Sequence, residues 1–361
     1  MPSAADAAAA PALLNALEPL ALSRQFLAFP PEGFEVGQVG GAPLFIARLD
    51  LLTTADDELK ARAARLPGFA RWSRWMRVRT AFVGTTSTEY APLPSGVPPS
   101  SLADALRAGP CRRHKLTIVK DLPQQSPLLP EADNRAADAL AQALSACGFV
   151  SLEGQALAYV PIDFADADAY LARLSSSGRK NLRRKLRSRA ELRIERIPTG
   201  DAFAGDATVD AYYALYEAVF AQSDIHFDKL GRDFFAALLR DRDDGGVVFE
   251  YRRVSDGLLL GWNLCFEYGG KLVDKYIGLA YPQAREANLY FVSWMVNLEY
   301  ALERGLSHYI AGWTDPEVKA RLGASFTFTR HLVYVRNPLL RALARRFARR
   351  FESDRAWSEQ A

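Results

Sequence analysis

Two short turns fix the topology of the second half of this 361-residue chain. Ser255-Asp256-Gly257 and Gly269-Gly270 each lie between strand-like apolar runs, where tight hairpins place residues of positive φ. The runs that they separate, residues 246–254, 258–268 and 271–279, are therefore predicted as three consecutive antiparallel strands. Rossmann and barrel folds alternate parallel strands with helices, so this meander argues against both of them.

Helices and strands surround the meander in a definite order. Residues 166–190 are predicted as one long helix, followed by a strand at 192–197 and by helices at 209–221 and 231–240. After the meander we predict a helix, a strand, a short helix, a strand pair and a final helix, at residues 288–304, 308–311, 316–321, 326–335 and 339–351. This order predicts an α+β fold with a mostly antiparallel sheet flanked by helices.

The first half is also a mixed run of strands and helices, and a chain of this length exceeds one ordinary core. Its predicted strands are residues 34–50, 78–85, 114–119, 149–152 and 157–161. We expect four segments, namely a flexible tail at 1–20, a first module at 21–162, a second module at 163–336 and a basic helix at 337–361.

Composition limits the classes of protein and of site. Hydrophobic residues make up 49% and charged residues 24%, which is typical of a globular chain. No apolar run approaches the roughly 20 residues that cross a bilayer, and the Ala-rich start does not resemble a signal peptide. The three cysteines form no CxxC pair and no histidines have the spacing of metal ligands. We therefore expect a cytoplasmic protein without a metal site.

The net charge is only +3, but the cations are concentrated. Residues 179–189 hold seven Arg and Lys side chains, and residues 336–355 hold seven more. Such runs attract phosphates on a cofactor, a nucleic acid or a membrane. A solvated amphipathic helix explains the same pattern without a ligand.

The residues that carry a resemblance lie in the second half: the basic run from Ser177 to Leu186, Asp274-Lys275-Tyr276-Ile277-Gly278, and Lys319-Ala320-Arg321-Leu322-Gly323. In this order and spacing, residues 165–335 resemble bacterial N-acyltransferases of the GNAT superfamily, in the branch of the Fem-type peptidoglycan aminoacyltransferases. Lys120-Asp121-Leu122-Pro123 resembles the degenerate first module of such proteins. The resemblance implies two GNAT-like modules, with the acyltransferase site in the second.

The resemblance also implies where the acyl donor binds. The strand at 271–279 would separate from its neighbour and let a pantetheine arm lie along it, while the loop 280–287 and the following helix start face the pyrophosphate. A helix N-terminus suits this role because its N–H groups are free and its dipole is positive there. The cofactor-binding residues expected on this basis are Tyr276, Gly278, Gln283, Arg285 and Asn288.

One segment departs from the family pattern. The usual loop, Gln or Arg followed by x-x-Gly-x-Gly or Ala, is replaced by Gln283-Ala284-Arg285-Glu286-Ala287. Two donors are therefore considered. The first is acetyl-CoA or a longer acyl-CoA, with an amine of a small molecule, sugar or peptide as acceptor. The second is an aminoacyl-tRNA, used to form a peptide bond on a cell-wall precursor or metabolite.

Three side chains are candidates for the chemistry. Asp274, in an otherwise apolar strand, would take a proton from the attacking amine, and Glu267 on the preceding strand is a second candidate for this base. An ion pair with Lys275 or with another strand explains Asp274 equally. Lys319 would stabilise the oxyanion of a tetrahedral intermediate, or is simply a solvated lysine.

Substrate contacts are expected from Arg179 and Arg183 on the basic helix, from His226 in a loop between two helices, and from Trp313. A capping or core role is the alternative for His226.

The final helix is a separate candidate surface. Its apolar stripe recurs at helical spacing and comprises Leu339, Leu340, Leu343, Phe347 and Phe351. The simpler expectation is that this stripe docks on the protein's own core. The other is that residues 339–351 contact a tRNA or an anionic membrane, because arginines cover most of the remaining surface of the helix.

Overall fold

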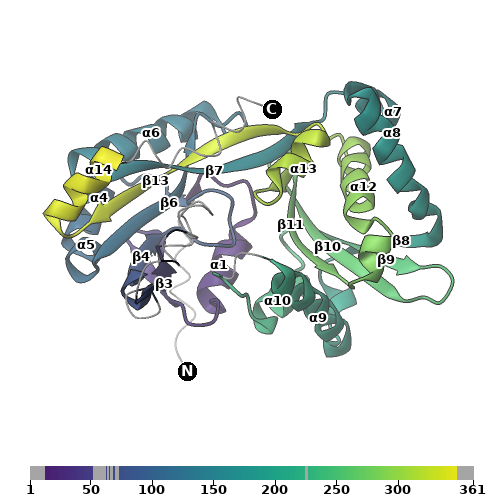
Figure 1. The fold of residues 1–361 in the computed structure, drawn as a ribbon, viewed down its shortest axis with the longest axis horizontal. Coiled ribbons are helices and arrows are strands. Elements are labelled where there is room, and N and C mark those ends of the chain that lie inside the picture. Colours follow the sequence, from purple (N-terminus) through teal and green to yellow (C-terminus); the bar gives the residue numbers. More distant parts are fainter. Residues whose placement is uncertain are drawn as a thin grey trace. The chain divides into compact units, whose positions relative to one another are not determined.

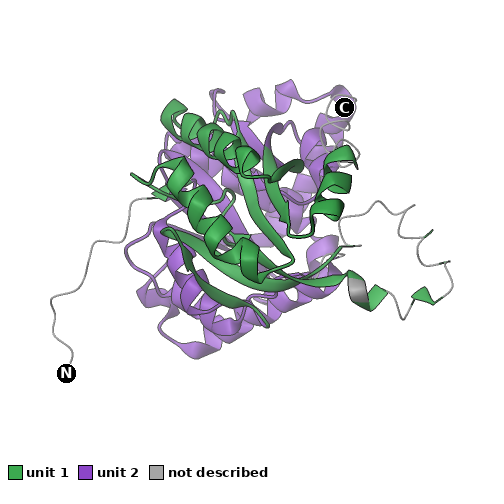
Figure 2. Ribbon diagram, turned by 90° about the vertical axis from the view of Figure 1, so that its left-hand side faces the viewer, with its two compact units in different colours: residues 1–16, 33–154, 329–352 green, residues 17–32, 155–328, 353–361 purple. Residues whose placement is uncertain are grey.

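The computed structural model describes residues 13–51, 62, 65, 68–69, 73–223 and 227–347. The chain forms two compact units, and neither is a continuous stretch of sequence (Figure 2). Unit 1 takes in residues 33–154 and 329–352, and unit 2 takes in residues 17–32 and 155–328.

Unit 2 is a seven-stranded arrangement in the order β13-β7-β12-β11-β10-β9-β8. The strands β8 to β11 are antiparallel neighbours, β12 is antiparallel to β7, and β11 and β12 are parallel. Their bounds are β7 Val150–Pro161, β8 Leu192–Pro198, β9 Gly246–Arg253, β10 Leu259–Tyr268, β11 Lys271–Leu279, β12 His308–Gly312 and β13 Ser325–Val335. The predicted meander is therefore β9, β10 and β11.

The helices of unit 2 lie on both faces of this sheet. The helices α7, α8 and α12 lie on one side of β9 to β11, and α9 and α10 lie on the other (Figure 1). The α-helices are α1 Leu20–Ala28, α7 Ala167–Arg173, α8 Ser176–Lys185, α9 Asp206–Gln222, α10 Arg232–Leu239, α11 Gln283–Glu286, α12 Leu289–Glu303 and α13 Pro316–Arg321. Two 3-10 helices are η2 Leu186–Glu191 and η3 Asp201–Phe203.

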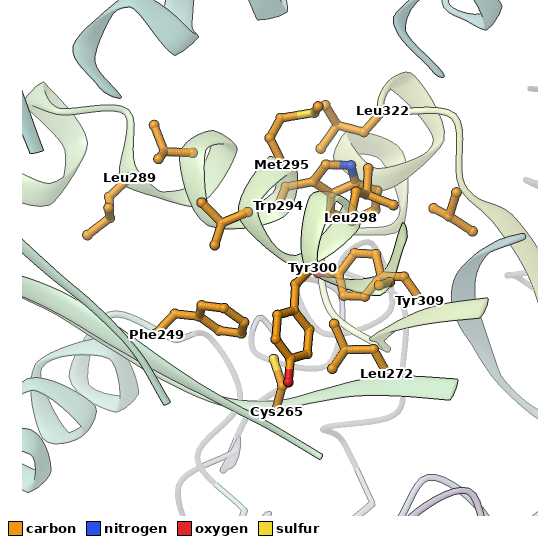
Figure 3. Packing of buried hydrophobic residues seen from close by; sticks show 14 of the residues in the cluster. Phe249, Cys265, Leu272, Leu289, Trp294, Met295, Leu298, Tyr300, Tyr309 and Leu322 are labelled. Atoms are coloured by element: carbon orange, nitrogen blue, oxygen red, sulfur yellow. The ribbon is translucent and has the colours of Figure 1, made fainter. Parts of the chain in front are cut away.

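The core of unit 2 lies between α12 and the sheet. Trp294, Met295 and Leu298 of α12 are almost completely buried, as are Phe249 and Leu272 on the strands (Figure 3). Because α12 is apolar around most of its circumference, it can be covered on nearly every side. No helix in the described ranges is long and apolar enough to cross a membrane.

Unit 1 repeats the same plan with fewer strands, in the order β2-β3-β4-β6-β13-β7. Here β4 and β6 are the parallel pair, and β2, β3 and β4 are antiparallel neighbours. The further bounds are β1 Leu13–Leu14, β2 Glu35–Val39, β3 Ala42–Asp50, η1 Ser73–Met76, β4 Arg77–Val83, β5 Leu93–Pro94, α4 Pro99–Ala108, α5 Pro110–Arg113, β6 Leu116–Gln124, α6 Glu131–Ala146 and α14 Pro338–Phe347. The core of this unit includes Leu106, Val119, Leu140 and Leu332.

The strands β7 and β13 each contribute one part to each unit. Both were predicted as pairs of short strands, and both are single long strands. In β7 the predicted break falls near Gly154, which is a site of close approach and not a turn. A Cβ at Gly154 would lie only 2.1 Å from Oγ1 of Thr329 on β13, so the two strands pack closely there.

The boundaries of the two units differ from the predicted domain boundaries at 20/21 and 162/163. Residues 17–32 belong to unit 2, where α1 packs on α10 and the Glu32 amide donates to the Lys229 carbonyl at 3.4 Å. The helix α1 buries Leu22 and Phe26 completely, which gives this segment an apolar reason to fold.

The predicted helix at 166–190 is interrupted. It consists of α7, α8 and η2, because the chain turns at Leu174 and Ser175. Leu174 is buried, and the Ser175 hydroxyl accepts a hydrogen bond from the Gly178 amide at 3.1 Å, which caps a new helix. The basic run therefore begins at a helix start of its own.

Candidate functional site

The parallel strands β11 and β12 pair over only three residues. Lys271, Leu272 and Val273 are opposite His308, Tyr309 and Ile310, and no further pairing between these strands occurs in the part of the chain that the structure describes. On its other edge β11 stays paired with β10 as far as Leu279. Beyond Val273, β11 therefore has one edge without a strand neighbour.

A β-bulge at this position sets the directions of the side chains. Asp274 is opposite Cys265 and Tyr276 is opposite Leu264, so Lys275 is the additional residue on β11. Alternation is broken as a result. Asp274 contacts the α12 face, whereas the next two side chains both contact the other face. Such a bulge cannot be read from apolar alternation.

Asp274 accepts hydrogen bonds at both carboxylate oxygens. Its Oδ1 lies 3.2 Å from Asn263 Nδ2 and 3.5 Å from Cys265 Sγ, both on β10. Its Oδ2 lies 2.9 Å from Asn297 Nδ2 on α12 and 3.0 Å from the Tyr309 hydroxyl on β12. Three elements thus hold this carboxylate in one orientation, and the four partner side chains are themselves buried.

Burial raises the pKa of the Asp274 carboxyl, while hydrogen bonds from Asn263, Tyr309 and Cys265 and the charge of Lys319 act in the opposite direction. Residues 274–277 are all partly exposed, although β11 lies within the sheet. A positioned carboxyl with a raised pKa is suited to accept a proton near neutral pH.

Lys319 lies close to the end of β12. Its side chain is buried, and its Nζ donates a 2.6 Å hydrogen bond to the Ala311 carbonyl. The expectation of a solvated lysine is therefore wrong. The ammonium of this α13 residue is therefore fixed at Ala311, one residue before Gly312, where β12 ends.

Tyr290, in the first turn of α12, was not identified from the sequence. Its hydroxyl is buried and makes no hydrogen bond within the described residues. Burial and the negative charges of Asp315 and Asp274 raise its pKa, so it stays protonated and remains a hydrogen-bond donor. Tyr290 and Asn297 are seven residues apart on a helix and so lie on the same face. This spacing could have identified Tyr290 from the sequence.

These features were compared with known proteins. The acetyltransferase (GNAT) domain family matches residues 176–320. The chain carries a GNAT acetyltransferase domain. Unit 2, which contains residues 176–320, is accordingly an acyltransferase domain, and unit 1 repeats its strand order on a smaller scale. No curated protein matches the sequence.

Solved structures support the fold. The C-terminal domain of a putative lysylphosphatidylglycerol synthetase from Agrobacterium fabrum has a TM-score of 0.52 at 13% identity, covering 90% of this chain and 88% of that one. L-PGS from Bacillus licheniformis has a TM-score of 0.50 at 11% identity, covering 92% and 97%. FemX has a TM-score of 0.48 at 11% identity, covering 90% and 98%.

Within the GNAT domain, the predicted cofactor residues lie on two different surfaces. Tyr276 packs edge-on against Phe235 of α10, with ring centroids 5.2 Å apart, on the face opposite Asp274. Gly278 lies on the same face, where a Cβ would come within 2.3 Å of Trp262 Nε1. Packing alone therefore accounts for this glycine.

The remaining predicted cofactor residues lie before α12. Gln283 begins α11, and Arg285 contacts the Gln222 side chain and stacks over the Tyr281 ring at 4.8 Å. Asn288 adopts a left-handed conformation at the N-cap of α12. The first amides of a helix have no partner within it, so this end of α12 can accept an anion.

Other predicted site residues make ordinary structural contacts. Glu267 accepts hydrogen bonds from Tyr300 and, at 3.1 Å, from Arg304. Arg304 neutralises its carboxylate, and neither partner is part of the network around Asp274. Arg179 donates to the Ala172 carbonyl at 3.4 Å. Arg183 pairs with Asp168 at 3.1 Å on an exposed surface.

Two further residues complete the predicted set. Trp313 follows the last residue of β12, and His226 lies outside the described residues. Among the residues that are described, no three His, Cys, Asp or Glu side chains group as metal ligands would.

Proposed function

We propose that unit 2 binds an acyl donor along the unpaired edge of β11 and transfers the acyl group to an amine. The observation that carries this proposal is the end of β11–β12 pairing at Val273, immediately before Asp274. Unpaired strand amides and carbonyls can bind an extended amide-bearing arm as a further strand would. The pantetheine arm of coenzyme A is such a group.

In the proposed reaction the amine nitrogen attacks the thioester carbonyl carbon, and the carbon–sulfur bond breaks to release the thiolate. Asp274 takes the amine proton, directly or through a water molecule. Lys319 and the Tyr290 hydroxyl donate hydrogen bonds to the carbonyl oxygen as it becomes negative. The raised pKa of Tyr290 keeps its hydroxyl a donor, while the hydrogen bonds and the Lys319 charge around Asp274 oppose the effect of burial and favour its ionised, proton-accepting form.

A covalent cysteine intermediate is not part of this proposal. Cys265 is completely buried, and burial together with Asp274 raises the pKa of its thiol well above the ordinary value. The thiol therefore stays protonated at neutral pH, and a protonated thiol is a poor nucleophile.

For the donor we propose acetyl-CoA or a longer acyl-CoA, with its pyrophosphate at the start of α12 near Arg285 and Asn288. The test is thermal melting of the full chain with acetyl-CoA. A ligand at 100 times its Kd raises the unfolding free energy by about 2.7 kcal/mol. No change in Tm at millimolar acetyl-CoA would overturn this donor.

An aminoacyl-tRNA is the second candidate donor. The absence of the usual glycine loop at residues 283–287 and the exposed cations of α8 favour it. The Agrobacterium domain that shares the fold belongs to a putative synthetase of an aminoacylated lipid. Co-purification of RNA, with retention of tRNA weakened in Arg183→Gln, would support this donor over acyl-CoA.

We also propose that residues 339–351 contact an anionic surface.

A further inference from the structure

Unit 1 contains a cavity of about 550 Å³ formed by α4, α5 and the end of β13. Its lining includes three arginines and one acidic side chain, in the set Asp104, Arg107, Cys111, Arg112, Tyr334 and Arg336. From Arg336 in the cavity lining the chain continues into α14, which begins two residues later. None of these residues takes part in the site proposed for acyl transfer.

Two of the arginines around this cavity are fixed by an aromatic ring. Tyr334 is 6% exposed, and its ring centroid lies 4.3 Å from Arg107 Cζ and 4.7 Å from Arg341 Cζ. Arg341 also donates to the Val335 carbonyl at 3.1 Å, and Arg336 donates to the Arg112 carbonyl at 3.0 Å. The guanidinium groups are therefore oriented by neutral groups.

No carboxylate of the described residues forms an ion pair with these cations, which are Arg107, Arg112, Arg336 and Arg341. Asp104 is the one acidic residue in the lining. Like charges held together repel, and a phosphate that accepts hydrogen bonds from two guanidinium groups relieves the repulsion.

The helix α14 exposes its leucines and turns an arginine toward unit 1, which is the reverse of an ordinary surface helix. Its side that carries Arg341 packs on Tyr334, whereas Leu339, Leu340 and Leu343 are 80%, 55% and 52% exposed. The simpler expectation, that the apolar stripe docks on the core, is therefore wrong for these leucines. The side chains of Phe347 and Phe351 lie outside the described set.

We propose that this cavity binds the phosphate headgroup of an acidic phospholipid while the exposed leucines of α14 enter the bilayer. A bilayer surface offers both an anionic and an apolar layer, and these match the arginines and the adjoining leucines. A nucleic acid would leave the leucines in water. A second copy of the chain would bring a like set of arginines against the first.

The test uses the full chain and sedimentation with vesicles of phosphatidylcholine and phosphatidylglycerol in a 3:1 ratio, at low salt. We expect binding to these vesicles and little binding to phosphatidylcholine alone. Arg112→Gln with Arg336→Gln should weaken binding about 25-fold, since one arginine near an acidic surface contributes about 5-fold. Leu339→Gln with Leu343→Gln should weaken it at least as much, because the apolar contact is lost.

Matched controls come from unit 2. Leu258→Gln replaces a leucine that is 41% exposed elsewhere, and Arg187→Gln replaces an exposed arginine of the basic run. Both should leave vesicle binding unchanged, and circular dichroism should show that every variant is folded. Loss of binding in Arg187→Gln, with binding intact in the unit 1 variants, would overturn the proposal.

Three other results would also overturn it. Equal binding to both vesicle types would remove the headgroup site. A rise in Tm with inorganic phosphate that Arg112→Gln with Arg336→Gln abolishes, without vesicle binding, would assign the cavity to a free phosphate. Dimerisation in light scattering that the leucine variants abolish, again without vesicle binding, would make a second copy the partner. Acyl transfer to a soluble amine is independent of all these outcomes.

Discussion

The two units share a topology, and they differ at the equivalent point of their parallel strand pairs. In unit 1, β4 and β6 pair from Thr80 to Val83, and the chain then turns at Gly84. Lys120 on β6 donates to the Thr85 carbonyl at 2.9 Å and pairs with Asp121. The Lys120 side chain therefore lies just beyond the last paired residues of β4 and β6.

In unit 2 the corresponding strand continues past the end of the pairing and has Asp274 at that point. The carboxylate is held by four neighbours and belongs to a partly exposed residue, whereas Asp121 in unit 1 is only 4% exposed. We infer that the Lys120 side chain leaves no room for a donor between the parallel strands of unit 1. The site depends on what fills this region and not on the strand order.

The largest expected difference concerns stability. Each unit has a buried lysine–carboxylate pair, Lys275–Glu18 in unit 2 and Lys120–Asp121 in unit 1, and the side chains of the first pair are only 6% and 1% exposed. Glu18→Gln should lower the unfolding free energy by about 3–5 kcal/mol, because removing one partner of a buried ion pair leaves the other charge less compensated. Urea unfolding measures this effect. Asp121→Asn should have a smaller effect, since Lys120 is 18% exposed, and an equal loss would contradict the ranking.

Asp274→Asn should lower turnover by about 100-fold or more, as expected for the removal of a general base. The matched change in unit 1, Asp121→Asn, should leave turnover within about 2-fold, because unit 1 takes no part in the proposed reaction. Equal losses from the two substitutions would mean that both carboxylates are structural. Steady-state kinetics with circular dichroism would separate these outcomes.

The same residue predicts a pH dependence. Burial raises the folded-state pKa of Asp274 above its unfolded value of about 3.9, so the protonated form is favoured by folding. Its contribution to stability therefore falls as pH rises from about 3.9 through the raised folded-state pKa. Asp274→Asn should lack this decline when Tm is measured against pH, and kcat/KM of the wild type should rise over the same interval. Parallel Tm profiles for the two proteins would exclude a raised pKa.

Tyr290→Phe should lower turnover by about 10-fold without loss of stability, because the hydroxyl makes no hydrogen bond among the described residues. Tyr309→Phe is the informative contrast within unit 2. It removes a donor to Asp274 and should lower both turnover and Tm. A Tyr290→Phe enzyme with full activity would remove this hydroxyl from the mechanism.

The smallest expected effect concerns donor binding. Arg285→Gln should weaken coenzyme A binding by about 5-fold, since one exposed charge–phosphate contact contributes roughly 1 kcal/mol. Arg107→Gln in unit 1 should not change this affinity in isothermal titration. Weakening by Arg107→Gln alone would assign the donor to unit 1.

Much of the fold followed from local patterns in the sequence. The meander was predicted because its turns carry glycines. The short helix predicted at 316–321 is α13, which has Pro316 at its start. The interruption at Ser175 and the continuity of β7 were missed, because each depends on contacts with residues distant in sequence. Thr329, which packs on Gly154, is one such residue.

The candidate site was predicted only in part. Asp274 was identified because a carboxylate in an apolar strand is unusual, and the surroundings of Lys319 were not identified. Asn263, Asn297 and Tyr309 come from three elements, and only the folded chain brings them to one carboxylate. The bulge at Lys275, which determines the direction of Asp274, results from strand pairing and leaves no mark in hydropathy.

The division of β7 and β13 between the units affects the order in which they can form during translation. Unit 1 includes residues 329–335 of β13, which are synthesised after residues 155–328 of unit 2 have been added. At about 5–20 residues per second, the roughly 170 residues between the two parts of unit 1 require on the order of 10–30 s. The module that leaves the ribosome first is therefore the last to gain its full set of strands, and chaperones would encounter it with the place of β13 still open.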